Sequence, residues 1–300
     1  MDEADRAVKG EGESMNAMNP PERSDTASAA PSCVPDAPRM LTTTVVGMAR
    51  HAPTIVELVL AHPAMPDLQP GQFVHLRVPE GEAFLRRPLS VADYDDGTHT
   101  LRLIFRTVGV GTKRLSAVRP GDRLDVFFPP SGGFPMDIVP SGGRAVIVGG
   151  GLGVAPLLYL AKALNLRGVR VRARIGFAAV EEVYGLERLS AHAEVELWTD
   201  DGSAGRRGRV TDGLSPEEPF QALYACGPEP MFVALKARFR HDGRPMFAAL
   251  EARMACAVGV CRACVVPVRA DGGIVHRRVC RDGPVFPLQS LVFPGEEEWA

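Results

Sequence analysis

Between residues 40 and 135 the chain consists of short runs in which apolar and polar residues alternate or β-branched residues gather. Pro, Gly and Asp separate the runs, as in Pro70-Gly71 and Pro120-Gly121-Asp122. Strands that bury one face have this pattern, so repeated short runs with turn residues between them predict an antiparallel barrel or sandwich. The predicted strands are Leu41–Val46, Thr54–Leu60, Gln72–Val78, Leu101–Arg106 and Arg123–Phe128.

A different rhythm begins at Arg144 and continues to about Leu250. Short apolar runs now alternate with longer segments of helical character. This alternation predicts an open parallel α/β sheet, because parallel strands need crossover connections that are usually helices. The predicted strands are Ala145–Val148, Val171–Phe177, Val195–Thr199 and Ala222–Ala225, and the predicted helices are Pro156–Leu166 and Pro230–Phe239.

The two ends of the chain differ from these regions. Residues 1–38 are rich in Pro and acidic residues and contain no aromatic residue, Leu or Ile. They are predicted to be a disordered tail, since they cannot bury enough apolar surface to offset their ordering entropy. The C-terminal segment is rich in Cys and Gly, with strand candidates at Cys264–Val268 and His276–Val279. We therefore expect the tail at 1–38, a barrel domain at 39–140, an α/β domain at 141–248 and a Cys-rich domain at 249–300.

Composition and charge limit the class of protein and its location. Apolar residues make up 45% and charged residues 23%, which is typical of a soluble globular protein. The net charge of -2 offers no basic footprint for nucleic acid. The acidic start of the chain lacks the apolar core of a secretory signal, so the cytoplasm is the expected compartment. The uncharged stretch Ala145–Ala161 contains several glycines and Pro156, which argues against a membrane span.

Four of the six cysteines lie close together near the C-terminus. The spacing Cys256-x4-Cys261-x2-Cys264, followed by Cys280, is that of plant-type [2Fe–2S] sites with a short last interval. The residues between the first two cysteines are small, so backbone amides can turn inward and hydrogen-bond the sulfurs. A structural zinc site is the alternative, although such sites usually show two short C-x2-4-C knuckles. The remaining cysteines are Cys33, expected to be an exposed bystander in the tail, and Cys226.

Two glycine-containing loops connect a predicted strand to a predicted helix. In the first loop, at residues 149–153, the backbone amides and the start of the helix can cradle a pyrophosphate. Pro156 replaces the third glycine of the usual dinucleotide fingerprint. The second loop comprises residues 226–228. Its Cys226 is either a small core residue or a neighbour of a bound nicotinamide. Because loops that follow strands of one sheet face a common crevice, the two together predict a dinucleotide site. The residues expected to bind are Gly149, Gly150, Gly151 and Gly153, and Cys226, Gly227 and Pro228.

In the barrel region, the segment Phe84–Ser90 presents a guanidinium and a hydroxyl three residues apart. Arg87 can grip a pyrophosphate with two hydrogen bonds, and Ser90 can hydrogen-bond a flavin ring nitrogen. Gly111 and Thr112 supply a further glycine turn with a hydroxyl. No G-x-S-x-G or G-K-[ST] motif appears in the sequence, so hydrolysis and phosphoryl transfer have no support.

Taken together, these residues resemble a known family. The strings Leu250-Glu251-Ala252-Arg253-Met254-Ala255-Cys256 and Arg278-Val279-Cys280-Arg281-Asp282-Gly283-Pro284-Val285-Phe286 are similar to those of electron-transfer subunits of bacterial NAD-dependent dihydroorotate dehydrogenases, in the ferredoxin–NADP reductase superfamily. The resemblance implies FAD, a [2Fe–2S] cluster and NAD as co-substrate. It places FAD contacts on Arg87, Pro88, Leu89, Ser90, Ile104, Phe105, Arg106, Gly111 and Thr112, and cluster ligands on Cys256, Cys261, Cys264 and Cys280.

The resemblance also implies a partner and a pathway. Electrons from dihydroorotate would leave an FMN in a separate catalytic subunit, in a heterotetramer that serves pyrimidine biosynthesis, and would reach NAD through the cluster and FAD. No residue of this chain is then expected to perform acid–base chemistry on dihydroorotate. The sequence departs from the family at Ala257 and Ala263, where glycine is usual. A positive φ at either position would strain the loop by about 1 kcal/mol.

Two other interpretations remain open. One keeps the redox chain and changes the partner, as in the flavin subunit of a sulfhydrogenase or of an NADH-dependent ferredoxin:NADP oxidoreductase. The other is a zinc-stabilised, non-catalytic interaction module that has kept the scaffold and lost its cofactors. Both glycine loops and the pair Arg87 and Ser90 weigh against that module, because nothing in it would require them.

Overall fold

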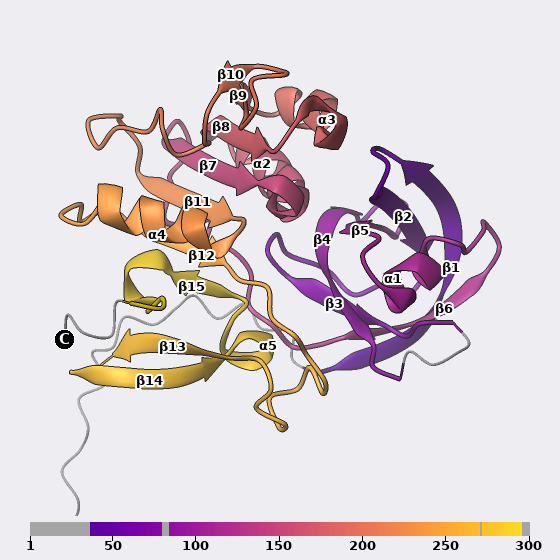
Figure 1. Cartoon of the computed structure of the whole chain (residues 1–300). Coiled ribbons are helices and arrows are strands. Elements are labelled where there is room, and N and C mark those ends of the chain that lie inside the picture. The colour runs from indigo at the N-terminus through magenta and orange to yellow at the C-terminus, as the bar shows by residue number, and fades with distance from the viewer. Residues whose placement is uncertain (1–36, 80–83, 271, 296–300) are drawn as a thin grey trace, which may run out of the picture. The chain divides into compact units, whose positions relative to one another are not determined.

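The structure of the chain is a computed structural model, which describes residues 37–79, 84–270 and 272–295. The first of its sheets is the predicted antiparallel barrel, closed in the order β1-β2-β5-β4-β3-β6 (Figure 1). Its strands are β1 (Arg39–Arg50), β2 (Ile55–Ala61), β3 (Phe73–Leu76), β4 (Arg87–Asp95), β5 (Thr100–Arg106) and β6 (Arg123–Phe128), with helix α1 (Val110–Leu115) between the last two.

Alternation of side chains explains why the barrel forms. In β6, Leu124, Val126 and Phe128 are buried, while the residues between them are more exposed. The same alternation carries Leu58, Leu60, Leu101 and Leu103 into the barrel core from β2 and β5. Apolar burial of this kind closes the sheet on itself and fixes the register of neighbouring strands. Strand β4 begins at Arg87, so the barrel itself presents the segment with the predicted flavin contacts.

The second sheet has seven strands in the order β10-β9-β8-β7-β11-β12-β15. All neighbouring pairs are parallel except the last, in which β15 runs antiparallel to β12. The predicted open parallel sheet is therefore confirmed, with one antiparallel edge strand added. The elements are β7 (Arg144–Gly150), α2 (Val154–Leu166), β8 (Arg170–Phe177), α3 (Leu186–Ser190), β9 (Glu194–Thr199), β10 (Arg206–Arg207), β11 (Ala222–Cys226), α4 (Glu229–Arg238), β12 (Met246–Ala249) and β15 (Val285–Pro287), with 3-10 turns at Gly151–Gly153, Val180–Glu182 and Leu288–Ser290.

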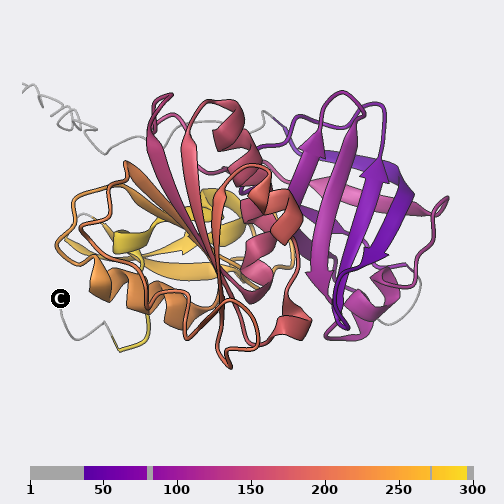
Figure 2. The same cartoon turned by 90° about the horizontal axis from the view of Figure 1, so that it is seen from above.

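Helix α2 covers one face of this sheet and packs against barrel strand β4 (Figure 2). Ion pairs join the barrel to the α/β layer beside it. Lys162 of α2 lies 2.7 Å from Asp93 of β4. Arg188 of α3 donates two hydrogen bonds, of 2.7 and 2.9 Å, to the buried carboxylate of Glu57 in β2. These contacts fix how the two sheets face each other.

The C-terminal segment packs on the other face of the sheet, beside α4. Strands β13 (Val265–Ala270) and β14 (Gly273–Arg278) form a hairpin at the positions of the two predicted strands. Helix α5 (Val279–Asp282) follows. Phe286, Leu288 and Phe293 share a core with Phe232 of α4. The segment is thus built into the core of the sheet.

The predicted disordered tail, with Cys33, lies almost entirely outside the described residues, which begin at Ala37. Within the described ranges, no helix is long and apolar enough to cross a membrane.

Candidate functional site

A cavity of about 680 Å³ lies between the barrel, the sheet and the C-terminal segment. A volume of this size is typical of sites that hold a cofactor-sized ligand. Of the residues predicted to contact FAD, seven line it: Arg87, Pro88, Leu89, Ser90, Ile104, Gly111 and Thr112. They come from β4, β5 and the start of α1, three elements that barrel closure brings together.

Arg87 lies directly over Gly111. A Cβ atom on Gly111 would fall 2.6 Å from Nε of Arg87, so a side chain there would require the guanidinium to shift. The guanidinium donates to the Leu85 carbonyl and, among the described residues, has no carboxylate partner. The adjacent Arg86, by contrast, pairs with Asp125 at 2.9 Å. A half-buried guanidinium without a counter-charge, at the wall of a cavity, is suited to a phosphate anion.

Two predicted flavin contacts do not lie at this cavity. Phe105 is 1% exposed and belongs to the barrel core. Arg106 instead forms a two-point ion pair with Glu182, at 3.1 and 3.0 Å. Side chains alternate along a strand, so Phe105 points away from the face that carries Ile104. Arg106 is on the same face as Ile104, but its guanidinium is held by Glu182. Thr112 reaches the cavity, but its hydroxyl already accepts hydrogen bonds from the amides of Val108 and Gly109 and shapes that loop.

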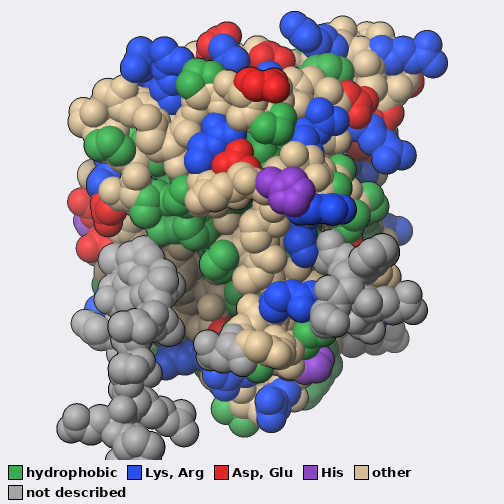
Figure 3. Space-filling view, turned by 90° about the vertical axis from the view of Figure 1, so that its left-hand side faces the viewer, with side chains coloured by type: hydrophobic (Ala, Val, Ile, Leu, Met, Phe, Trp, Pro, Cys, Tyr) green, Lys and Arg blue, Asp and Glu red, His purple; other side chains and the backbone are tan. Residues whose placement is uncertain are grey.

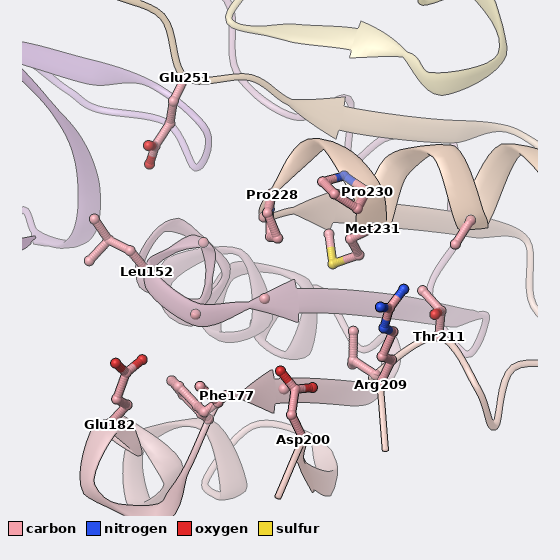
Figure 4. A pocket seen from close by; sticks show the side chains of 18 residues that line it. Leu152, Phe177, Glu182, Asp200, Arg209, Thr211, Pro228, Pro230, Met231 and Glu251 are labelled. Carbon is pink, nitrogen blue, oxygen red and sulfur yellow. The ribbon is translucent and has the colours of Figure 1, made fainter. Parts of the chain in front are cut away.

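A second cavity, of about 540 Å³, lies over the carboxyl ends of the parallel strands (Figure 4). The predicted residues Gly150, Gly151, Gly153, Gly227 and Pro228 line it. The two loops nearly touch here, since a Cβ on Gly153 would lie 2.2 Å from the carbonyl oxygen of Cys226. Gly149 does not line the cavity. Its missing side chain instead leaves room for Leu157 and Val154, which a Cβ would meet at 3.0 Å.

Leu152 and Glu251 line both cavities. Ligands in the two cavities would therefore approach each other beside these residues. Burial among protein atoms raises the pKa of the Glu251 carboxyl, although its side chain is exposed toward the cavities. Cys226 lines only the larger cavity, and its burial raises the pKa of the thiol, so the thiol stays protonated at neutral pH.

The sequence patterns assigned no role to the acidic residues of these walls. Glu251 belongs to the sequence segment that carries the family resemblance, and this position could have marked it as a candidate site residue. Glu182 and Asp200 follow different strands, and only the fold brings them to the second cavity.

The four predicted cluster ligands form two pairs. The amide of Cys261 donates to Sγ of Cys256, and that of Cys280 donates to Sγ of Cys264, each at 3.4 Å. Burial would raise the pKa of Cys256, but backbone amides of Cys261, Val258 and Val260 lower it to about 6. The amides thus turn toward sulfur, as expected from the small residues of this loop.

The paired arrangement bears on the kind of metal group. Among the described residues, no group of three or more His, Cys, Asp or Glu side chains is arranged to hold a metal ion. Two pairs of cysteines, each joined by an amide-to-sulfur hydrogen bond, are compatible with two thiolates on each iron of a two-iron cluster. Arg278 stabilises the loop, because its guanidinium donates hydrogen bonds to the carbonyl of Gly259 and to the carboxylate of Asp282 in α5.

The loop has left-handed backbone at two residues that carry a side chain. Ala257 has φ of 55° and Arg262 has φ of 56°, while Gly259 has φ of 83°. Ala257 thus has the positive φ that would favour glycine, and Ala263 does not. Ala257 is also 1% exposed, so its methyl group is packed in the core beneath the loop.

Comparison with known proteins supports this description. The family described as the iron–sulfur cluster binding domain of dihydroorotate dehydrogenase B matches residues 251–292. The dihydroorotate dehydrogenase B (NAD(+)) electron transfer subunit of Geobacillus thermodenitrificans is 46% identical over 83% of this chain and 97% of the relative. That of Streptococcus mutans is 38% identical over 83% and 96%.

Two solved structures extend the comparison. An NADH-dependent reduced ferredoxin-NADP oxidoreductase is 29% identical, with a TM-score of 0.73 over 84% of this chain and 90% of that chain. A ferredoxin NADP+ reductase from Neisseria gonorrhoeae, solved with FAD and NADP, is 20% identical, with a TM-score of 0.57 over 68% and 92%. The latter shows a common fold.

Proposed function

The chain belongs to the family of electron-transfer subunits of NAD-dependent dihydroorotate dehydrogenase B, and from this we propose that it moves electrons between a partner subunit and NAD. The partner would be a catalytic subunit that holds FMN and oxidises dihydroorotate for pyrimidine biosynthesis, with two copies of each subunit in the assembly. Free thiols that serve as cluster ligands suit the reducing cytoplasm, where we place the protein.

One observation carries the proposal: the three candidate sites are continuous. The dinucleotide and flavin cavities meet at Leu152 and Glu251. The flavin cavity is lined in turn by Met254, which packs in the same core as Ala257, Cys264 and Cys280. Bound FAD can take a hydride from a nicotinamide and pass single electrons to an iron–sulfur cluster.

We assign each part of that path to residues of this chain. Residues 39–140 would bind FAD, with Arg87 on its pyrophosphate and Ser90 on the flavin ring. Residues 141–248 would bind NAD through the loops at Gly150–Gly153 and Cys226–Pro228. Residues 249–300 would hold the cluster on Cys256, Cys261, Cys264 and Cys280. Gly111 leaves room for the Arg87 guanidinium, and the amides directed at sulfur stabilise thiolate over thiol.

The mixed charge of the surface is compatible with a protein partner. The face in Figure 3 shows Lys and Arg side chains interspersed with Asp and Glu, and the net charge of the chain is -2. Val260 on the cluster loop is 80% exposed and Cys261 is exposed, so the loop is accessible to a docking protein. Nucleic acid would require a strongly basic face.

The test is isolation of the chain from its own cell with whatever it binds. The proposal predicts flavin and cluster absorbance, oxidation of NADH with an artificial acceptor, and co-purification of an FMN-containing dihydroorotate dehydrogenase subunit. A colourless, zinc-containing protein would contradict it.

The likeness to the NADH-dependent reduced ferredoxin-NADP oxidoreductase favours a second candidate, a flavin subunit for another partner. Its identity of 29% is below the 38–46% found for the dihydroorotate dehydrogenase relatives. A second flavoprotein or a hydrogenase subunit that co-purified in place of the dehydrogenase would support it.

A further inference from the structure

Tyr184 is a buried residue that contacts the first glycine loop from the core side. It lies shortly after the 3-10 turn at Val180–Glu182, is 4% exposed and lines neither of the two cavities. Its hydroxyl donates a hydrogen bond of 2.9 Å to the carbonyl oxygen of Leu152 and lies 3.4 Å from that of Gly151. Burial raises the pKa of Tyr184, so the hydroxyl keeps the proton that it donates.

This hydrogen bond decides which way the loop directs an amide. A trans peptide group is planar, and its carbonyl and its amide point in opposite directions. The carbonyl of Leu152 shares its peptide group with the amide of Gly153. Because Tyr184 binds that carbonyl from the core, the amide is directed to the other side, where Leu152 and Gly153 line the dinucleotide cavity.

The start of helix α2 meets the same hydroxyl. The first amides of a helix have no partner within it, and a side chain at the N-cap usually satisfies one of them. The N-cap of α2 is Gly153, which leaves those amides to other partners. The amide of Ala155, in the first turn, donates toward the hydroxyl oxygen of Tyr184. One hydroxyl therefore joins the loop to the helix start, the two parts of the predicted pyrophosphate site.

Aromatic packing fixes the ring of Tyr184. The ring lies edge-on to that of Phe177 at the end of β8, with centroids 5.5 Å apart and planes inclined by 67°. Phe177 and Leu152 line the same cavity (Figure 4). Tyr184 thus supports two residues of the cavity wall from behind.

The segment that carries Tyr184 is attached to the barrel on both sides of this residue. Before it, Glu182 pairs with Arg106 of β5 at 3.0 Å. After it, Arg188 pairs with the buried Glu57 of β2 at 2.7 Å. The position of the hydroxyl is therefore set by the barrel and by Phe177, and not by the glycine loop that it orients.

We propose that Tyr184 is a positioning residue of the dinucleotide site, whose hydroxyl turns the amides of the glycine loop toward the pyrophosphate of a bound dinucleotide. The inference rests on the proposed binding of NAD in this cavity. Tyr184 acts through the peptide group of Leu152 and Gly153, since it lies behind the cavity wall. Without the hydroxyl, the carbonyl of Leu152 loses a buried partner, and the peptide group is free to rotate away from the anion.

The test is titration of the flavin- and cluster-loaded full chain with NADH and with ADP-ribose, which carries the pyrophosphate but no nicotinamide. Tyr184→Phe keeps the ring and removes only the hydroxyl. It should raise both dissociation constants by the same factor, about five- to tenfold, and leave the FAD content unchanged.

Tyr159→Phe is the matched control. The hydroxyl of Tyr159, in α2, also donates to a backbone carbonyl, that of Leu68 at 2.7 Å, and Tyr159 lines neither cavity. The control should lose a similar amount of thermal stability and keep both affinities unchanged.

Equal affinities in Tyr184→Phe and Tyr159→Phe would overturn the inference and leave the proposed function standing. A loss for NADH without a loss for ADP-ribose would also overturn it, because the effect would not come from the pyrophosphate. A further measurement needs no variant: ADP-ribose should slow hydrogen exchange at the amides of Leu152 and Gly153 by about tenfold or more, and amides left unprotected would overturn the inference. Failure of the unaltered chain to bind NADH and ADP-ribose would contradict the proposed function itself, and the inference with it.

Discussion

Gly153 and Cys226 lie so close that a methyl group on the first would overlap the carbonyl oxygen of the second, at 2.2 Å. The contact joins the two loops that frame the dinucleotide cavity, one after β7 and one after β11. The glycine here permits a close approach of two backbones, whereas its own φ is in the ordinary right-handed region. The shape of the cavity therefore depends on this one position.

Gly153→Ala should push the two loops apart. We expect a loss of about 1–3 kcal/mol in the free energy of unfolding, and an increase of about tenfold or more in the dissociation constant for NADH. Thermal unfolding and fluorescence titration measure the two effects. Gly243→Ala is the matched control, since nothing lies within 4 Å of the added methyl group. Equal NADH affinity in the two variants would refute the account of this contact.

Arg87 and Gly111 should act as one unit in binding FAD. Gly111→Ala displaces the guanidinium, so it should weaken FAD binding as Arg87→Ala does, and the double variant should be little worse than either single one. Equilibrium dialysis of free flavin measures the three dissociation constants. Lys113→Ala, an exposed change on the same helix, serves as control. Additive losses would mean that Gly111 acts independently of Arg87.

The cluster ligands are separable from the flavin site. Cys280→Ser and Cys261→Ser each remove a thiolate from one of the two pairs, so each should abolish the visible absorbance of the cluster and leave bound FAD. Cys226→Ser is the control, because Cys226 lies at the flavin cavity. The cluster absorbance of this variant should match that of the unaltered chain. Iron and sulfide analysis checks the result, and full iron content in Cys280→Ser would contradict the ligand assignment.

Glycine should be tolerated better at Ala257 than at Ala263. At Ala257, with φ of 55°, glycine relieves backbone strain of about 1 kcal/mol, although it also removes a buried methyl group. Ala263 has no positive φ, so glycine there should only cost stability, by about 0.5–1 kcal/mol. Denaturant unfolding of the cluster-loaded protein compares them. The strain account would be wrong if Ala257→Gly were the less stable of the two.

Glu57 should make stability depend on pH in the acid range. Burial would raise its pKa, but hydrogen bonds from Arg188 and His51 and the charge of Arg188 lower it from 4.5 to about 2. A carboxyl with a lowered folded pKa contributes stability above its unfolded pKa. That stability is therefore lost as pH falls from about 4.5 to about 2. The pKa shift corresponds to at most about 3 kcal/mol of stability, and solvent screening of the partly exposed Arg188 reduces this value.

Glu57→Gln tests this directly. The variant should be less stable at neutral pH, because Arg188 and Arg102 lose their shared partner, and its stability should change less between pH 5 and pH 2. Urea unfolding at each pH gives both curves. Parallel pH profiles for the two proteins would exclude Glu57 as the titrating group.

The sequence predicted the barrel, the parallel sheet and the cluster motif because each depends on local periodicity or spacing. It could not place β15 in the sheet, since three residues carry no periodic signal and their pairing with β12 is a tertiary contact. Phe105 and Arg106, predicted flavin contacts, do not line the cavity, because Phe105 points into the barrel core and Arg106 is paired with Glu182, a partner that only the fold supplies. Asp200, Glu182 and Glu251 come together only after the chain has folded.

The central claim is that the dinucleotide site, the flavin cavity and the thiol pairs form one path for electrons. Anaerobic titration of the purified chain with NADH, followed by visible absorbance and electron paramagnetic resonance, tests it most directly. The account predicts that NADH bleaches the flavin band and produces a reduced-cluster signal, and that Cys280→Ser retains only the first change. If NADH altered neither signal, or reduced the cluster in a chain depleted of flavin, the claim would be contradicted.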